Sequence, residues 1–165
     1  MEQVNKPSWV FGLLRIAFGW MFLWAFIDKL WGLGFATAGN RSWLSGASPT
    51  SGYLSYGTKG PLAEMFAAMA NTPMVDWLFM LGLLFVGLTL VLGIMTHLGI
   101  IAAISMLALF YLAGSIWPQN NPFLDEHIIY IITLIGLWKL NAGDVWGLGS
   151  WWSRTQLAST HKLFR

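Results

Sequence analysis

The sequence contains no cysteine. This absence excludes disulfide exchange, thiolate nucleophiles and cysteine-ligated zinc or iron–sulfur clusters, so any redox chemistry must use a bound small molecule or another subunit. Charged residues make up only 10% of the 165 positions, and no run of Lys and Arg occurs, so nucleic acid is not an expected partner. We also find no HExxH motif, glycine-rich phosphate loop or Ser-His-Asp pattern.

The sequence consists mainly of apolar residues. They make up 56% of the chain, which includes eleven tryptophans, and the mean hydropathy is +0.61. A water-soluble domain of this size could hardly keep such residues off its surface, so we expect one membrane domain over residues 1–165. Because a helix needs about 20 mostly apolar residues to cross a bilayer, the sequence predicts an all-α, polytopic, antiparallel four-helix transmembrane bundle. The predicted spans are 9–31, 73–95, 97–117 and 122–141.

The segment between the first two spans is too long and too aromatic for a simple connector. Residues 34–60 are dense in Gly, Ser, Thr and Pro, which indicates a structured loop with room for a short hairpin. A short amphipathic helix is predicted near 61–71, and the C-terminal segment, with three tryptophans and several basic residues, is expected to lie on the membrane. The distribution of Lys and Arg predicts both termini on the cytoplasmic side of the plasma membrane and the long loop outside.

The first span carries three ionisable residues, namely Arg15, Asp28 and Lys29. Arg15 and Lys29 share one helical face, made up of Arg15, Gly19, Phe22, Phe26 and Lys29. Two interpretations stay open. Both cations could extend along their methylene stems to the headgroups, or they could point into the bundle as part of a polar site. In the second case Lys29 needs a partner, and Glu126 or Asp28 is the candidate.

The candidate site lies at the outer ends of the helices, under the long loop. On the predicted topology six ionisable residues gather there: Asp28, Lys29, Asp76, Asp125, Glu126 and His127. For Asp76 and Asp125 we favour the simpler interpretation that they mark helix starts at a membrane boundary. Lys29, Glu126 and His127 are the stronger functional candidates. No metal site is predicted, and His97 and His127 lie at opposite membrane faces, roughly 30 Å apart, so they cannot ligate one haem within a subunit.

A polar stripe is predicted to lead from this end into the bundle. Glu126, Tyr130 and Thr133 keep helical spacing on the fourth span and therefore share a face. On the outer side, Lys29, Arg41 and Lys59 could attract an anion.

Three stretches carry a resemblance to a known family. The run LLRIAFGWMFLWAFIDKL in the first span, the run GLTLVLGIMTHLGIIAA across the second and third, and NPFLDEHIIYIITLIGL followed by NAGDVWGLGSWW together resemble the DoxX superfamily. Within that superfamily the likeness is greatest to the DoxD-like small subunit of thiosulfate:quinone oxidoreductase. The resemblance implies a four-helix membrane subunit that helps to pass electrons from an oxidisable sulfur anion, such as thiosulfate, to a quinone beside a second subunit.

On that reading, the quinone or the anion binds near the outer ends of the first and fourth spans, under the loop with Trp43, Tyr53 and Tyr56. Glu126 or His127 would handle protons and Lys29 would supply positive charge, as catalytic residues. The expected binding residues are Arg15, Asp28, Arg41, Trp43 and Tyr130. Two other classes stay open: a non-catalytic accessory or assembly subunit of a larger respiratory complex, and a small solute carrier, for which the halves of the chain show no convincing repeat.

Overall fold

The computed structural model describes residues 9–164, so the polar tail predicted for residues 1–8 and the terminal Arg165 lie outside the described residues. The described chain is all-helical, and no strand occurs within it. The predicted all-α class is therefore confirmed, and residues 34–60 form short helices and turns rather than a hairpin.

Three long helices agree closely with the first three predicted spans. They are α1 (Trp9–Trp31), α4 (Pro73–Leu92) and α5 (Thr96–Phe110), the last continued by η3, a π-helical turn (Tyr111–Ser115). Segments Trp9–Trp31, Pro73–Leu92 and Thr96–Gly114 are long and apolar enough to cross a membrane. By length and composition, these helices indicate a membrane protein that contacts the lipid bilayer.

The fourth predicted span begins later than expected. The predicted start at residue 122 took Asn121, which precedes Pro122, as the N-cap, but Asp125 is the N-cap and helix α6 covers Glu126–Lys139. The Asn121 side chain instead accepts hydrogen bonds from the backbone N–H groups of Phe123 and Leu124 at 3.2 and 2.9 Å, which closes a turn before the helix. At 1.5 Å per residue, the 14 residues of α6 extend only about 21 Å.

Shorter elements occupy the long loop and the C-terminal segment. The loop contains η1 (Gly39–Arg41), η2 (Trp43–Ser45), α2 (Ser51–Tyr56) and α3 (Ala63–Ala67), of which only α3 corresponds to a predicted helix. After α6 follow η4 (Ala142–Asp144), α7 (Gly149–Trp152), α8 (Gln156–Thr160) and η5 (Lys162–Phe164).

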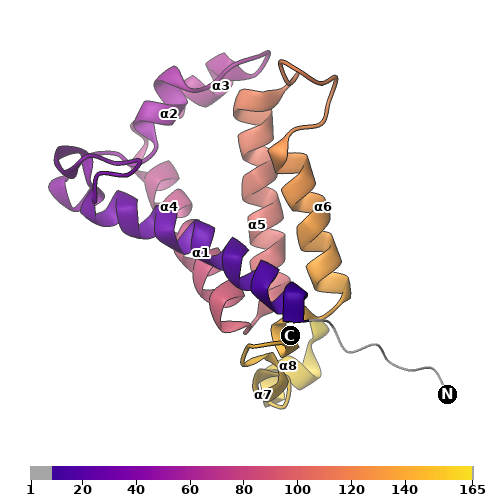
Figure 1. Cartoon of the computed structure of the whole chain (residues 1–165). Coiled ribbons are helices and arrows are strands. Elements are labelled where there is room, and N and C mark those ends of the chain that lie inside the picture. The colour runs from indigo at the N-terminus through magenta and orange to yellow at the C-terminus, as the bar shows by residue number, and fades with distance from the viewer. Residues whose placement is uncertain (1–8, 165) are drawn as a thin grey trace.

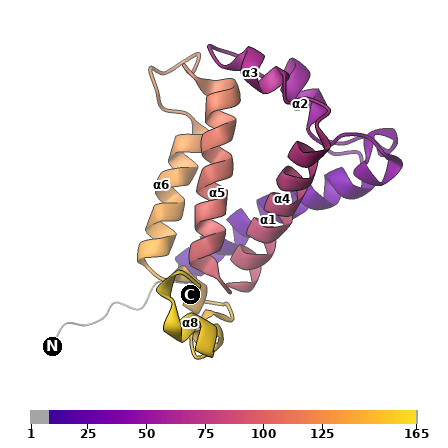
Figure 2. The same cartoon turned by 180° about the vertical axis from the view of Figure 1, so that it is seen from behind.

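The long helices form two pairs that diverge. Helix α1 packs on α4 and α5 packs on α6, and the pairs meet at the end where α7 and α8 lie (Figure 1). From there they separate toward the opposite end, which α2 and α3 bridge, as the view from behind also shows (Figure 2). Apolar side chains from all four helices fill the junction, among them Phe22, Val86, Ile100 and Leu134.

Glycines let α1 and α4 approach each other closely. A Cβ atom on Gly19 would lie 2.6 Å from the backbone nitrogen of Val91, and one on Gly87 would lie 2.7 to 2.8 Å from backbone and Cβ atoms of Leu23. Both distances are too short for any side chain. Membrane helices lack a hydrophobic drive to associate, so such small residues are the means by which their backbones pack.

The segment that contains α2 is fastened to both helix pairs. At one end the hydroxyls of Ser48 and Thr50 donate to a carboxylate oxygen of Asp76, in the first turn of α4, at 2.8 and 2.6 Å. At the other end the backbone N–H of Lys59 donates to the carbonyl of Ala113 in η3 at 2.9 Å. The segment is therefore a strap that spans the open end, and we call residues 48–59 the strap below.

Candidate functional site

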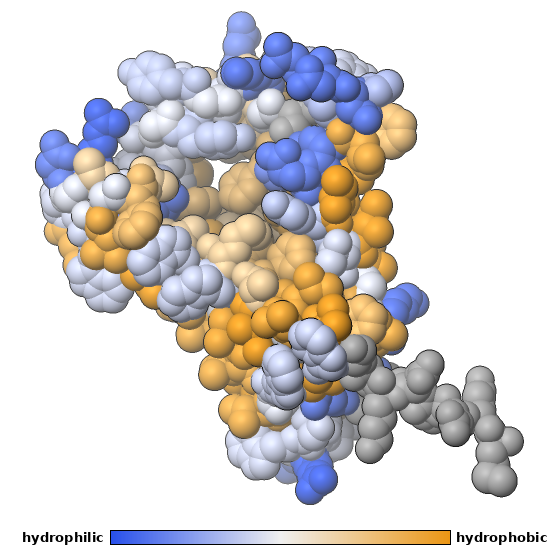
Figure 3. All heavy atoms as spheres, in the orientation of Figure 1, coloured by the Kyte–Doolittle hydropathy of each residue, from blue (hydrophilic) through white to orange (hydrophobic). Residues whose placement is uncertain are grey.

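A cavity of about 610 Å³ lies beneath the loop and the strap. Its wall includes the half-buried Lys29 of α1, the exposed Arg41 of η1, and the strap residues Ser51, Tyr53, Ser55 and Tyr56. None of the described lining residues is acidic. In space-filling view the surface is hollowed between the loop and the helices, and hydrophilic residues gather at this end (Figure 3).

A line of rings connects Lys29 to the opposite helix pair. The Lys29 Nζ atom lies 5.8 Å from the centre of the Phe79 ring of α4, a cation–π contact. The Phe79 ring lies 6.2 Å from that of Phe110 at the end of α5. Phe110 in turn contacts the rings of Tyr53, at 6.3 Å, and His127, at 6.1 Å. The rings thus join a cation from one helix pair to an imidazole from the other.

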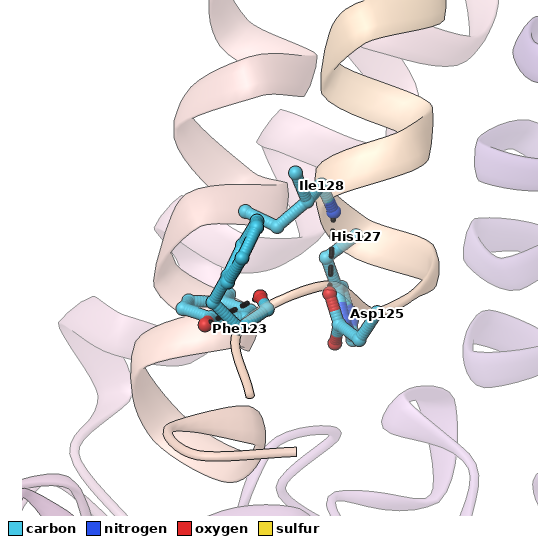
Figure 4. A network of polar contacts seen from close by, with 5 residues as sticks. Phe123, Asp125, His127 and Ile128 are labelled. Carbon is cyan, nitrogen blue, oxygen red and sulfur yellow. Dashed lines mark hydrogen bonds and ion pairs between the residues drawn. The ribbon is translucent and has the colours of Figure 1, made fainter. Parts of the chain in front are cut away.

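His127 is held by the residue that caps its own helix. Its Nδ1 lies 2.7 Å from one carboxylate oxygen of Asp125, and the other oxygen accepts the Ile128 N–H at 3.2 Å (Figure 4). The His127 side chain is 19% exposed and that of Asp125 only 8%. Because Asp125 engages Nδ1, the nitrogen that can meet a ligand is Nε2. Asp125 is therefore a helix start, as predicted, and it also orients a candidate acid–base group.

The other groups of the predicted polar stripe are less suited to a site. Glu126 is exposed, the Tyr130 ring packs edge-on against Phe18 at 5.4 Å, and the Thr133 hydroxyl donates to the Ile129 carbonyl of its own helix at 2.8 Å. Within the described residues Lys29 forms no ion pair with Glu126 or Asp28. Asp28, its neighbour on α1, nonetheless acts on the Lys29 charge electrostatically. Of the two predicted partners Asp28 therefore remains, and the Phe79 ring is a further contact that was not predicted.

Asp28 and Asp76 both fasten the loop. The buried Asp28 carboxylate accepts hydrogen bonds from the backbone N–H groups of Phe35 and Ala36 at 3.3 and 3.0 Å. Asp76, also buried, holds the strap. The interpretation of Asp76 as a helix-start residue agrees with its position, but its hydroxyl partners in the loop were not foreseen. Predicted binding residue Trp43 packs edge-on against Trp77 at 4.6 Å and so helps to seat the same loop on α4.

Arg15 lies at the other end of the bundle. Fourteen residues separate it from Lys29 on one helix, which is roughly 21 Å. Its side chain is 0% exposed, which confirms that it points into the bundle. Its guanidinium donates five hydrogen bonds to backbone carbonyls, namely those of Leu90, Val91, Ala142, Val145 and Trp146.

All five N–H donors of the guanidinium are thereby used. The carbonyls belong to the end of α4 and to the turn after α6, so Arg15 joins three parts of the chain. Arg15 is therefore a structural residue that holds these parts of the chain together, and it is not part of the candidate site.

Sequence reasoning missed the two phenylalanines that connect Lys29 to His127. Phe79 and Phe110 are apolar residues on apolar helices, and the chain contains eleven phenylalanines, so composition offers no signal for them. Only the mutual rotation of α4 and α5 brings the two rings together. Within residues 9–164 no group of three or more His, Asp or Glu side chains is placed to hold a metal ion. His97 stacks on Trp138 near the start of α5, at the opposite end from His127.

Comparisons of the chain with protein-family models, curated proteins and solved structures found no match. The site is therefore argued from its own geometry.

Proposed function

We propose that this chain is a DoxX-type membrane subunit of a quinone-linked oxidoreductase in the plasma membrane, with four crossings and both termini in the cytoplasm. The length of α6, about 21 Å against about 30 Å of hydrocarbon, leaves its crossing short. The turn before it and η4 after it extend the segment at both ends. The placement of α2 and α3 at one end and α7 and α8 at the other supports four crossings (Figure 1).

One observation carries the functional proposal: Lys29, Phe79, Phe110 and His127 form a continuous line between the two helix pairs. A quinone ring is flat and apolar with polar oxygens at its edge, so it suits a site where aromatic faces sit beside a cation and an imidazole. The cavity beneath the strap reaches this line at Lys29 and at Tyr53, whose ring contacts Phe110, so a ligand in the cavity would lie beside it.

In this proposal His127 would supply a proton to the quinone, and Lys29 would stabilise negative charge on it. Reduction of a quinone to a quinol takes up two protons and two electrons. Two sulfur anions supply the electrons, one each, as their terminal sulfur atoms join in a new S–S bond. His127, held through Nδ1 by Asp125, would deliver a proton through Nε2. Lys29 would stabilise the negative charge that develops on the quinone oxygen. A second subunit would hold the sulfur anion, for which thiosulfate is the substrate that the resemblance suggests.

The test uses the chain purified with its native partners and reconstituted with quinone. We expect thiosulfate-dependent quinone reduction. Lys29→Met should lower kcat by about 100-fold, as loss of electrostatic stabilisation does, and His127→Gln by about 100-fold, as loss of a general acid does. Lys139→Met is the matched control, because it removes an exposed cation from the far end of α6. Glu126→Gln tests the exposed neighbour of His127.

The outcomes separate the parts of the proposal. An intact complex without thiosulfate-dependent reduction refutes the substrate, and reduction that neither Lys29→Met nor His127→Gln slows refutes the site. If Glu126→Gln alone abolishes activity, the proton-handling group is Glu126.

A specific observation also favours the accessory alternative. The outward face of α6 exposes Ile129, Ile132 and Ile135, at 50%, 61% and 44%, and this is a face that a partner helix could cover. If the chain purifies in a stoichiometric respiratory complex whose turnover is unchanged by Lys29→Met and His127→Gln but lost when the chain is deleted, the accessory function holds.

A further inference from the structure

We propose that the cavity under the loop binds the phosphate headgroup of an anionic phospholipid. The proposal concerns the cavity lined by Lys29, Arg41 and the strap. It shares Lys29 with the proposed quinone site, but it does not require that quinone chemistry takes place. Two cations from different elements face this cavity, and none of its described lining residues is a carboxylate.

The donors around the cavity suit a phosphate. Besides the two cations, the hydroxyl-bearing residues Ser55 and Tyr56 line it, as does Ser51, whose hydroxyl also donates to the Ser48 carbonyl at 3.4 Å. Tyr53 also lines it, and partial burial raises the pKa of that phenol, so it remains a neutral hydrogen-bond donor at physiological pH. Asp28 and Asp76 lie just behind the wall, but both carboxylates are buried and engaged by loop donors. The groups that an incoming ligand meets are therefore cations and donors.

The size of the cavity favours a headgroup over a free ion. Its volume of about 610 Å³ falls within the range of about 300–1,000 Å³ that holds drug-sized molecules. A single water occupies about 30 Å³ in the liquid, and a bare tetrahedral ion needs only a small part of the space. A headgroup with its glycerol would fill more of it.

The surroundings favour a ligand with acyl chains. The loop that carries Arg41 also exposes Leu33, Phe35 and Leu44, at 48%, 74% and 66%. Lys29 lies two residues before the end of a span-length helix, at the depth where headgroups meet hydrocarbon. Exposed apolar side chains beside cations are what a lipid needs, because its phosphate and its chains must both be accommodated.

The experiment measures lipid binding by native mass spectrometry of the purified chain in neutral detergent. Dioleoyl-phosphatidylglycerol is added as the probe, and dioleoyl-phosphatidylcholine and inorganic phosphate are added in separate titrations. We expect phosphatidylglycerol to be retained selectively. Lys29→Met and Arg41→Met should each weaken its binding about fivefold, the factor that roughly 1 kcal/mol per basic residue at an anionic lipid implies. Arg154→Met and Lys139→Met, exposed cations at the opposite end, should leave it unchanged.

Three results would overturn the proposal. Equal retention of phosphatidylcholine shows that the anionic charge is not recognised. Binding of inorganic phosphate as tight as that of phosphatidylglycerol identifies a site for a free oxyanion instead of a lipid. Equal weakening by Arg154→Met and Arg41→Met shows that the attraction is general and does not arise in this cavity. Because activity is not the readout, failure of the quinone proposal does not affect these outcomes.

Discussion

Replacing Arg15 tests whether a buried cation without a carboxylate partner holds this fold together. The substitution Arg15→Met keeps most of the side-chain length and removes five hydrogen-bond donors. Each buried carbonyl left without a partner costs about 1–3 kcal/mol, although water or small shifts will satisfy some of them. The variant also no longer buries a charge, which offsets part of the loss. With two of the five carbonyls left unsatisfied, the loss is about 2–6 kcal/mol before this offset, and the free energy of unfolding should fall by about 2–5 kcal/mol.

Two further variants separate charge from geometry. Arg15→Lys keeps the charge but offers three donors from one point, and these cannot reach carbonyls on both α4 and the 142–146 turn. We expect it to recover less than half of the loss. Arg41→Met removes an exposed cation and should stay within about 0.5 kcal/mol of the wild type.

Unfolding can be followed in detergent micelles by tryptophan fluorescence, since the chain carries eleven tryptophans. A loss of this size should lower Tm by on the order of 10 °C. If Arg15→Met melts with the wild type, the five bonds contribute nothing net and the reasoning is wrong. If Arg15→Lys matches the wild type, the positive charge at the end of α4 matters and the donor geometry does not.

Three other experiments test the packing, the strap and the topology. Gly87→Ala places a Cβ against the α1 backbone and should destabilise by about 1–3 kcal/mol, whereas Gly136→Ala, with open space around it, should be neutral or stabilising in the same melting assay. Asp76→Ala removes charge-assisted bonds worth about 1.5–3 kcal/mol each, and deuterium exchange should speed up in residues 48–59 while α5 keeps its protection. Because the chain has no cysteine, the single variants Ser55→Cys and Ser159→Cys each carry one thiol that can be labelled in sealed vesicles. If the two thiols react from opposite sides of the membrane, the result supports four crossings. If they react from the same side, α6 does not cross.

The sequence predicted the long helices well because bilayer thickness and apolar length determine them. The bounds of α1 were predicted without error, and α4 ends three residues early at Gly93, whose positive φ of 74° caps the helix. The start of α6 was wrong because two cap residues compete four positions apart. Asn121 precedes a proline, the usual signal, yet it closes a turn, and Asp125 accepts the Ile128 N–H instead. Local patterns cannot decide between two such caps.

The site was only partly predictable for a related reason. Helical spacing placed Arg15 and Lys29 on the inward face of α1, because periodicity is a property of one helix. Their partners depend on how separate helices meet. The carbonyls that bind Arg15 lie 75 to 131 positions away, and the ring beside Lys29 comes from α4. A search for an oppositely charged side chain finds neither of these partners, because backbone carbonyls and aromatic faces carry no charge in the sequence.

The ionisable residues of the helices fall into two groups: those whose hydrogen-bonding groups are engaged within the fold, and those that keep a group available for a ligand. Arg15 has all its donors engaged by backbone, and Asp28 and Asp76 accept two bonds each from loop groups. Such charges are satisfied in the folded chain, and a ligand would have to displace those bonds to reach them. Within the described residues Lys29 has the Phe79 ring and the electrostatic attraction of Asp28 beside it but makes no hydrogen bond, and His127 has one nitrogen committed to Asp125. If burial were the criterion, Arg15 would be the first candidate for the site. Unused hydrogen-bonding capacity selects Lys29 and His127 instead. These two residues lie on different helix pairs, and a ligand could bind either of them without breaking hydrogen bonds that hold the fold.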